Sequence, residues 1–427
     1  MKKGLLILTI ATLPGLANAQ LKGLMNRAKA QVENRINNKV DQGVNKALDQ
    51  VEGKGGGGSA AASTNEEGAE ETVPAKKGIT SYSKFDFVPG DKILYTEDFS
   101  QDVIGELPVN WNASGKGEVM TMEGQKGKWL RIFQNNVYLS GNKSSFGENF
   151  TIEFDMIYYF EPKKSGYVLP DMKFGFLSTG DKDNADNLFL KEYNYYNSTE
   201  VTINPYGGGG ARVVSGKNRG TSYSSDRITL NDYDKHFNKV LHYSIHVQKT
   251  RLRMWINEAK VFDIPRAVNV GDTINQVFFD MDGSNYKDEE IGVFVSNIKV
   301  ATGLPDTRHK LIEEGKFSTT GILFDVQSAV IKPESYGVVK EIASVLKENG
   351  TVKVKIIGHT DSDGADAANL ELSKQRAESV KALLTKEYGI EEGRMNAEGK
   401  GETQPVGDNK TKEGKAQNRR VEFVKEG

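Results

Sequence analysis

The sequence predicts a multidomain protein with an N-terminal helix, an all-β sandwich and a C-terminal α/β domain of βαβαβ order. Three observations predict this class. At 427 residues the chain is longer than one hydrophobic core ordinarily serves. Residues 84–300 alternate apolar and polar side chains with a period of two. From about residue 315, short apolar strands alternate instead with amphipathic runs of helical length.

The first residues have the composition of a secretory signal peptide. Residues 2–3 are lysines, residues 5–16 form a short apolar run, and residues 17–19 read ANA, a small-residue cleavage site. We therefore expect residues 1–19 to be a signal peptide and the protein to be exported. The chain contains no cysteine, so neither a disulfide nor a lipid attached to a cysteine is expected.

An amphipathic helix is predicted for residues 20–52 and a linker for residues 53–83. The helix has a narrow apolar stripe, formed by Met25, Ala28, Val32, Ile36, Val40, Val44, Ala47 and Val51. Such a stripe suits a helical partner better than a globular core, and a spacer helix is the alternative. The linker is rich in Gly, Ser, Ala and Glu, which bury too little apolar surface to order the chain.

Residues 84–300 are predicted to form a two-sheet sandwich. Residues 150–158 and 241–248 alternate most clearly, as strands with one buried face do. The runs LRMWIN and AKVFDI follow as two strands joined by a short turn at Asn257 and Glu258. The stretches YTEDFSQDVIGELPVNW, FTIEFDM and HYSIHVQKTRLRMWINEAKVFDIP resemble concanavalin-like or laminin-G-like domains. That resemblance implies a jelly-roll sandwich.

The C-terminal α/β domain is predicted for residues 315–427, after a connector at 301–314. Apolar periodicity predicts its strands at 322–324, 352–357, 395–397 and 420–424, and its helices at 335–349 and 372–388.

The segment GHTDSDGADAANLELSKQRA, residues 358–377, places charged side chains directly after a predicted strand. Asp361 leaves the strand, and Gly364 permits a tight turn. Asn369 can hold the loop through backbone groups. Arg376, one turn into the predicted helix, can then face Asp361 across the loop. If the two charges pair, they form a structural ion pair. If they are held apart, they suit a zwitterion with a carboxylate and an ammonium group.

The C-terminal motifs resemble the OmpA-like peptidoglycan-binding family. They are FDVQSAVIKPES, GHTDSDG, NLELSKQRA, GKGETQPVGDN and AQNRRVEF, in about a quarter of the chain. The resemblance implies non-covalent binding of peptidoglycan through the diaminopimelate of its stem peptide, without catalysis or cofactor. It also implies a periplasmic location, associated with the outer membrane of a Gram-negative-type envelope. An outer-membrane or periplasmic protein would be a second partner.

The resemblance also assigns the site residues. Asp361 would bind the ammonium group of diaminopimelate, and Arg376 its carboxylate. Thr360 would offer backbone groups, and Asn369 would shape the loop. Three further residues would line the pocket, and they are Asp325, Gln327 and Arg419. At position 327 the family usually has Asn or Asp, one methylene shorter than this glutamine.

The alternative function places a glycoside hydrolase or carbohydrate-binding protein in the sandwich, localised to the wall by the C-terminal domain. Glu153 and Asp155 share one face of a strand, as a glycosidase pair could, but that face is polar and is expected to be solvated. His242 and His246 would lie about 13 Å apart along a strand, too far to share a metal ion.

Composition and motifs exclude several other functions. No G-x-S-x-G, H-E-x-x-H or cysteine nucleophile occurs, so we expect neither a catalytic residue nor a metal. The net charge is −2 and no basic stripe stands out, so nucleic-acid binding is not expected.

Overall fold

The computed structural model describes residues 85–426, apart from 164–165, 181, 183, 194–195, 207–208 and 304–305. The predicted signal peptide, N-terminal helix and linker lie outside the described residues. By its contacts the chain divides into two compact units, residues 1–79 and 80–427, and the description below concerns the second. Within the described residues, no helix is both long enough and apolar enough to cross a bilayer.

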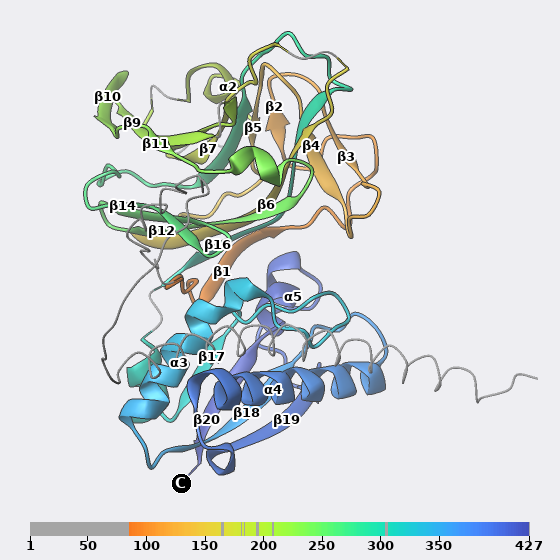
Figure 1. The fold of residues 1–427 in the computed structure, drawn as a ribbon, viewed down its shortest axis with the longest axis vertical. Coiled ribbons are helices and arrows are strands. Elements are labelled where there is room, and N and C mark those ends of the chain that lie inside the picture. Colours follow the sequence, from red (N-terminus) through yellow and green to blue (C-terminus); the bar gives the residue numbers. More distant parts are fainter. Residues whose placement is uncertain are drawn as a thin grey trace, which may run out of the picture. The chain divides into compact units, whose positions relative to one another are not determined.

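Two eight-stranded antiparallel sheets form the upstream domain (Figure 1). The first has the order β14 (Ala259–Ile264), β13 (Arg251–Ile256), β12 (Val240–Gln248), β6 (Asn149–Phe160), β16 (Ile291–Thr302), β4 (Trp129–Ile132), β3 (Gly117–Met120), with β1 (Lys92–Glu97) also paired to β16. The second has the order β10 (Gly220–Ser224), β9 (Gly210–Lys217), β8 (Ser198–Asn204), β7 (Met172–Leu177), β15 (Gln276–Met281), β5 (Asn136–Leu139), β2 (Asn112–Ala113), with β11 (Ile228–Thr229) paired to β9. Two short helices, α2 (Phe189–Glu192) and η3 (Tyr233–His236), lie in the connections.

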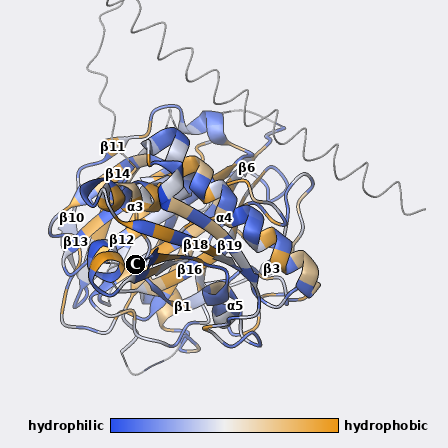
Figure 2. Cartoon of the chain, turned by 90° about the horizontal axis from the view of Figure 1, so that it is seen from below, coloured by the Kyte–Doolittle hydropathy of each residue, from blue (hydrophilic) through white to orange (hydrophobic). Residues whose placement is uncertain are grey.

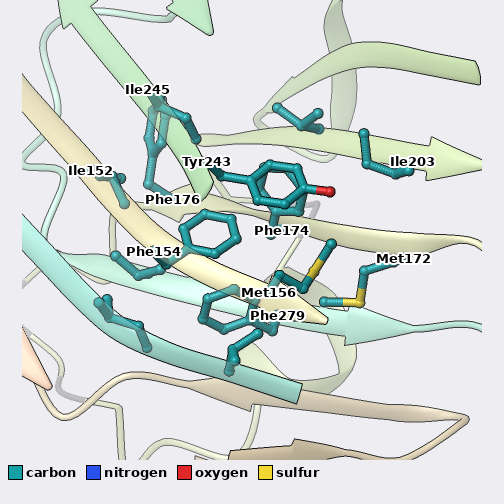
Figure 3. Close-up of a cluster of buried hydrophobic side chains, with 14 of the residues drawn as sticks. Ile152, Phe154, Met156, Met172, Phe174, Phe176, Ile203, Tyr243, Ile245 and Phe279 are labelled. Atoms are coloured by element: carbon teal, nitrogen blue, oxygen red, sulfur yellow. The ribbon is translucent and has the colours of Figure 1, made fainter. Parts of the chain in front are cut away.

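One hydrophobic core joins the inner faces of the two sheets. Figure 3 shows its aromatic centre, where the rings of Phe154 and Tyr243 stack with centroids 5.0 Å apart. Phe174 and Phe279, from the other sheet, meet Phe154 edge-on at 5.0 and 5.2 Å, a favoured geometry for aromatic pairs. The predicted all-β domain is therefore confirmed, whereas its assignment to the jelly-roll class stays a prediction.

The opposite face of β6 is also buried, so the prediction that Glu153 and Asp155 face solvent is wrong. Their exposed fractions are 3% and 6%. Lys299 Nζ lies 2.6 Å from Glu153 Oε2, and His242 Nδ1 lies 2.7 Å from Asp155 Oδ1. Burial disfavours the charged imidazole, but the hydrogen bonds and charges of the two carboxylates outweigh it and raise the pKa of His242 to about 9. Alternation marks a polar face without revealing whether another layer covers it.

The C-terminal domain has its own core and a four-stranded mixed sheet. The strand order is β17 (Lys316–Thr319), β20 (Val421–Glu426), β18 (Lys353–His359), β19 (Met395–Gly401). Only β18 and β19 run parallel. The helices are α3 (Tyr336–Glu348), α4 (Asp366–Tyr388) and α5 (Lys412–Asn418), with single turns η4 (His309–Glu313), η5 (Pro333–Ser335) and η6 (Glu392–Arg394). Figure 2 shows hydrophilic and hydrophobic residues mixed along α4, whose apolar side enters this core.

Two local predictions for this domain were wrong, and one helix was not predicted. The strand predicted at 322–324 is a single bridge between Phe324 and Ile331, and the edge strand is β17 instead. Helix α4 begins at Asp366, six residues before the predicted start at 372, and its first turns lie against Gly401 at the end of β19. Helix α5 was not predicted, since its seven residues are mostly polar and carry no apolar periodicity.

Residues 85–91 contact both domains. The Phe85 and Phe87 rings pack on Trp255 of β13, and the Gly90 amide donates to Thr151 Oγ1 of β6 at 3.0 Å. On the other side, a Cβ built on Gly337 of α3 would lie 2.2 Å from the Phe87 carbonyl oxygen. This segment therefore fills the space between the outer face of the first sheet and α3.

Two glycines let α4 lie close to the sheet. A Cβ on Gly358 of β18 would lie 2.1 Å from the Ser373 carbonyl oxygen, and one on Gly399 of β19 would lie 2.4 Å from the Lys374 amide. Both contacts are on the turn of α4 that precedes Arg376. The glycines therefore fix how near that arginine stands to the end of β18.

Replacing Gly358 should test this approach. The variant Gly358→Ala should lower the free energy of unfolding by about 1–3 kcal/mol, because the methyl group overpacks the contact with Ser373. Gly350→Ala is the matched control, since a Cβ there meets nothing within 4 Å. It should change stability by less than about 0.5 kcal/mol. Urea unfolding measures both, and equal destabilisation would contradict the account.

Protonation of His242 should make stability depend on pH. Its folded pKa of about 9 is above the ordinary 6.5, so its contribution is complete below pH 6.5 and is lost as pH rises through 9. Glu153 and Asp155 contact the ring, and Lys299 pairs with Glu153. The charge of Lys332 lowers the pKa of Asp155. Between these pH values, wild type should lose on the order of 2–3 kcal/mol more than His242→Gln.

The control for this measurement is His236→Gln, at an exposed histidine. Urea titrations at pH 6 and pH 9.5 should give this control the pH dependence of wild type. If His242→Gln shows the wild-type dependence as well, the protonated imidazole does not stabilise the fold.

Candidate functional site

Three elements bring the predicted site residues together. Asp361 follows the end of β18, Asn369 and Arg376 lie on α4, and Arg419 directly follows α5. The turn at residues 325–328 approaches α4 from a separate part of the chain. The site is therefore assembled where one strand, two helices and one turn meet.

Asp361 is 7% exposed and already has polar partners. Its Oδ1 accepts a hydrogen bond from the Asp363 amide at 3.1 Å, and its Oδ2 accepts one from Arg419 Nη1 at 2.5 Å. A carboxylate has about four acceptor positions, so about two remain for a ligand. The ion-pair partner of Asp361 is thus Arg419, and no ion pair joins it to Arg376 in the described structure.

Arg376 is held by its inner nitrogen and its flat face. Its Nε donates to the Ser328 carbonyl oxygen at 3.0 Å, and its guanidinium carbon lies 4.9 Å from the centre of the Phe324 ring. Its two terminal nitrogens have no hydrogen-bond partner among the described residues. Burial and, to a smaller extent, the Arg419 charge lower the pKa of Arg376, Asp361 opposes both, and the net pKa is about 10. The side chain remains charged at neutral pH.

Asn369 fastens the loop that carries Asp361. It lies in the first turn of α4, rather than in the loop as predicted, because the helix begins early. Its Nδ2 lies 3.4 Å from the Asp361 carbonyl oxygen, 3.2 Å from the Asp363 carbonyl oxygen and 2.6 Å from Glu402 Oε2. Gly364 has a φ of +104°, a conformation that most residues resist. The loop after β18 is therefore tied to both α4 and the end of β19.

Thr360, Asp325 and Gln327 are the remaining predicted site residues. The Thr360 amide donates to the Gly401 carbonyl oxygen at 2.9 Å, and its buried Oγ1 has no hydrogen-bond partner among the described residues. Asp325 and Gln327 are exposed, and Gln327 has a φ of +54°. The Ser328 amide donates to the Asp325 carbonyl oxygen at 3.1 Å, which closes the turn that carries the acceptor for Arg376.

Sequence reasoning missed three residues of the site. Phe324 and Ser328 were within the recognised FDVQSAVIKPES motif, but an aromatic ring and a backbone acceptor under an arginine leave no pattern in sequence. Lys415 of α5 lies 2.7 Å from Asp363 Oδ1. It stands four residues before Arg419, a spacing that places two side chains on one side of a helix, and this signal could have found it.

The sandwich carboxylates and histidines do not form a second centre. Glu153 and Asp155 are occupied by Lys299 and His242, as described above. His246 Nδ1 accepts from Arg253 instead, at 3.1 Å, and burial together with that charge lowers the pKa of His246 to about 4. No group of three acidic or histidine side chains suited to a metal ion occurs within the described part of the chain.

Comparison with known proteins identifies the part of the chain that holds the site. Residues 323–419 match the model of the OmpA family. Outer membrane porin F of Pseudomonas aeruginosa is 46% identical over 101 residues, which cover 24% of this chain and 29% of the porin. The chain thus spans less than a third of that relative's length. A solved structure, the cell wall anchor of the T6SS from Pseudomonas aeruginosa, is 34% identical, with a TM-score of 0.24 and coverage of 26% of this chain and 81% of the other.

A further relative is covered along most of its length. The outer-membrane lipoprotein YfiB of Pseudomonas aeruginosa is 33% identical over 144 residues, which cover 33% of this chain and 83% of the lipoprotein. Together with the matched residues 323–419, which contain Asp325, Asp361, Arg376 and Arg419, this similarity shows that the chain belongs to the OmpA family.

Proposed function

We propose that the chain binds peptidoglycan without covalent chemistry and so anchors an envelope component to the cell wall. In this proposal the diaminopimelate of the stem peptide lies between Asp361 and Arg376. One observation carries the proposal. Within the described part of the chain, both terminal nitrogens of Arg376 lack a hydrogen-bond partner while the nearby Asp361 pairs with Arg419, so the acid and this guanidinium do not neutralise each other.

The geometry suits a ligand with both charges exposed. A carboxylate can meet the terminal nitrogens of Arg376 as a two-pronged pair, because its planar fork matches that geometry. The stacking on Phe324 and the bond to Ser328 hold the fork in advance, which reduces the entropy lost on binding. An ammonium group can take the acceptor positions that Asp361 keeps free.

The wider role follows from the family and the charge chemistry. The relatives reported above carry outer-membrane names, and we propose a periplasmic, outer-membrane-associated location after export. Peptidoglycan would be one partner, bound by residues 315–427. An outer-membrane or periplasmic protein would be the other, bound through residues 20–52 or the sandwich. The proposed activity is binding alone, with no catalytic residue.

Arg376 should decide wall binding. In the full chain, Arg376→Ala should weaken retention on isolated peptidoglycan by roughly 30-fold or more, since a charge-assisted pair with the ligand carboxylate is lost. Arg376→Lys should recover only part of it, because a lysine cannot form two parallel bonds. Arg266→Ala, at an exposed arginine of the sandwich, is the charge-matched control. Co-sedimentation measures all four proteins, and equal retention of wild type and Arg376→Ala would reject the pocket.

Position 327 should favour a residue that tolerates its left-handed backbone conformation. Its φ of +54° lies in the left-handed region, where Asn is more favourable than Gln. Gln327→Asn should therefore raise the free energy of unfolding by about 0.5 kcal/mol and leave wall retention equal or higher. Gln327→Val should lower both, because a β-branched residue resists this conformation. Thermal unfolding and co-sedimentation test the pair, and a stabilising valine would refute the role of the turn.

A further inference from the structure

Helix α5 of the C-terminal domain is bonded along one side to the sandwich. Lys412 Nζ lies 2.5 Å from Glu97 Oε1 and 3.3 Å from Asp102 Oδ2, and both carboxylates are buried. Burial disfavours the charged amine, yet the two carboxylates raise the pKa of Lys412. Gln417 accepts from the Ile93 amide and donates to the Asp91 carbonyl oxygen, both at 3.0 Å. We call Asp91, Ile93, Glu97 and Asp102, the four residues on the sandwich side of these contacts, the β1 platform.

The same helix carries the charged groups that face the candidate site. Lys415 binds Asp363 at 2.7 Å, and Arg419 at the end of α5 binds Asp361 at 2.5 Å. Seven residues of helix rise about 10 Å, so a shift at Lys412 is transmitted to Arg419 through a rigid element. The sandwich thus contacts the site through α5, although no residue of the β1 platform is part of the pocket.

We propose that the β1 platform positions the wall-binding site, with Glu97 and Lys412 as positioning residues. This inference rests on the proposed function. While the platform holds α5, Arg419 occupies Asp361, and Arg376 stays available to a ligand carboxylate. When α5 is released, Arg419 withdraws, and Asp361 becomes free to pair with Arg376. The site then closes on itself. The sandwich is in this view a part of the binding apparatus rather than a separate module on the same chain.

Charge reversal at Lys412 tests the proposal in the full chain. Lys412→Glu faces two buried carboxylates and should release α5, which should weaken retention on isolated peptidoglycan by about three- to tenfold. The double variant Glu97→Lys with Lys412→Glu restores one pair of opposite charges and should recover part of the loss, since Asp102 stays beside position 412 and the Phe99 amide loses its acceptor. Lys410→Glu makes the same change of charge at an exposed lysine nearby and should retain wild-type binding. Gln417→Glu is the milder variant, should Lys412→Glu not fold, because it keeps an acceptor for the Ile93 amide and places a carboxylate oxygen against the Asp91 carbonyl in place of the lost donor.

Hydrogen exchange of the ligand-free protein supplies a readout independent of the wall. In Lys412→Glu, exchange should rise in residues 411–419 and also in the site loop, residues 359–365. A rise in 411–419 without a change in the loop or in retention would overturn the proposal and leave the proposed function intact. If wild type itself is not retained on peptidoglycan, the proposed function fails. Exchange in the loop then decides the positioning role alone: a rise supports it, and no change overturns it.

Discussion

The ion pair between Asp361 and Arg419 is the interaction on which the candidate site depends. Two arginines and one buried carboxylate meet at the end of β18, and in the described structure the carboxylate pairs with Arg419. Arg376 has its inner nitrogen bonded to Ser328, and its terminal nitrogens have no hydrogen-bond partner among the described residues. The structural ion pair and the ligand site were alternatives in the sequence. In the structure Asp361 forms an ion pair, but with Arg419 rather than with Arg376, and the ligand site remains the proposal made above.

The same constraint explains the elements around the site. Arg376 must stand near Asp361 without touching it, so α4 must lie at a fixed height over the sheet. Gly358 and Gly399 set that height by the close approach of two backbones. Asn369 then ties the Asp361 loop to the helix, and Gly364 lets the loop turn. These residues together fix the position of the Arg376 guanidinium relative to Asp361. A charged group binds a ligand most strongly when its geometry is fixed before the ligand arrives.

The upstream domain buries a cluster of charged side chains. The outer face of its first sheet holds Glu153, Asp155, His242 and Lys299 away from solvent, where an unpaired ion would cost several kcal/mol. Mutual pairing removes most of that cost, and an imidazole with a raised pKa completes the balance of charge. The carboxylates that might have served as a glycosidase pair are therefore committed to the interior.

Sequence patterns predicted the architecture more completely than the details of the site. Alternation from Phe150 to Tyr158 was enough for the strand, because period two is a local property. The early start of α4, helix α5 and the burial of Glu153 depend on what packs from distant segments, which no local window contains. The motif around Asp361 and Arg376 identified both residues. Arg419 as the competing partner, and Phe324 as the surface below Arg376, required the fold.

The charge balance of the candidate site favours the dipolar ligand of the proposed function over a simple anion. Arg376 and Arg419 repel each other, and this repulsion contributes to the lowered pKa of Arg376. A carboxylate at Arg376 relieves that repulsion, but an anion alone would also approach buried Asp361. An ammonium group on the same ligand cancels that second interaction. The zwitterionic group of the proposed ligand has no net charge, Asp361 is buried and Arg376 is half-buried, so screening by salt should weaken its binding less than the binding of an anion.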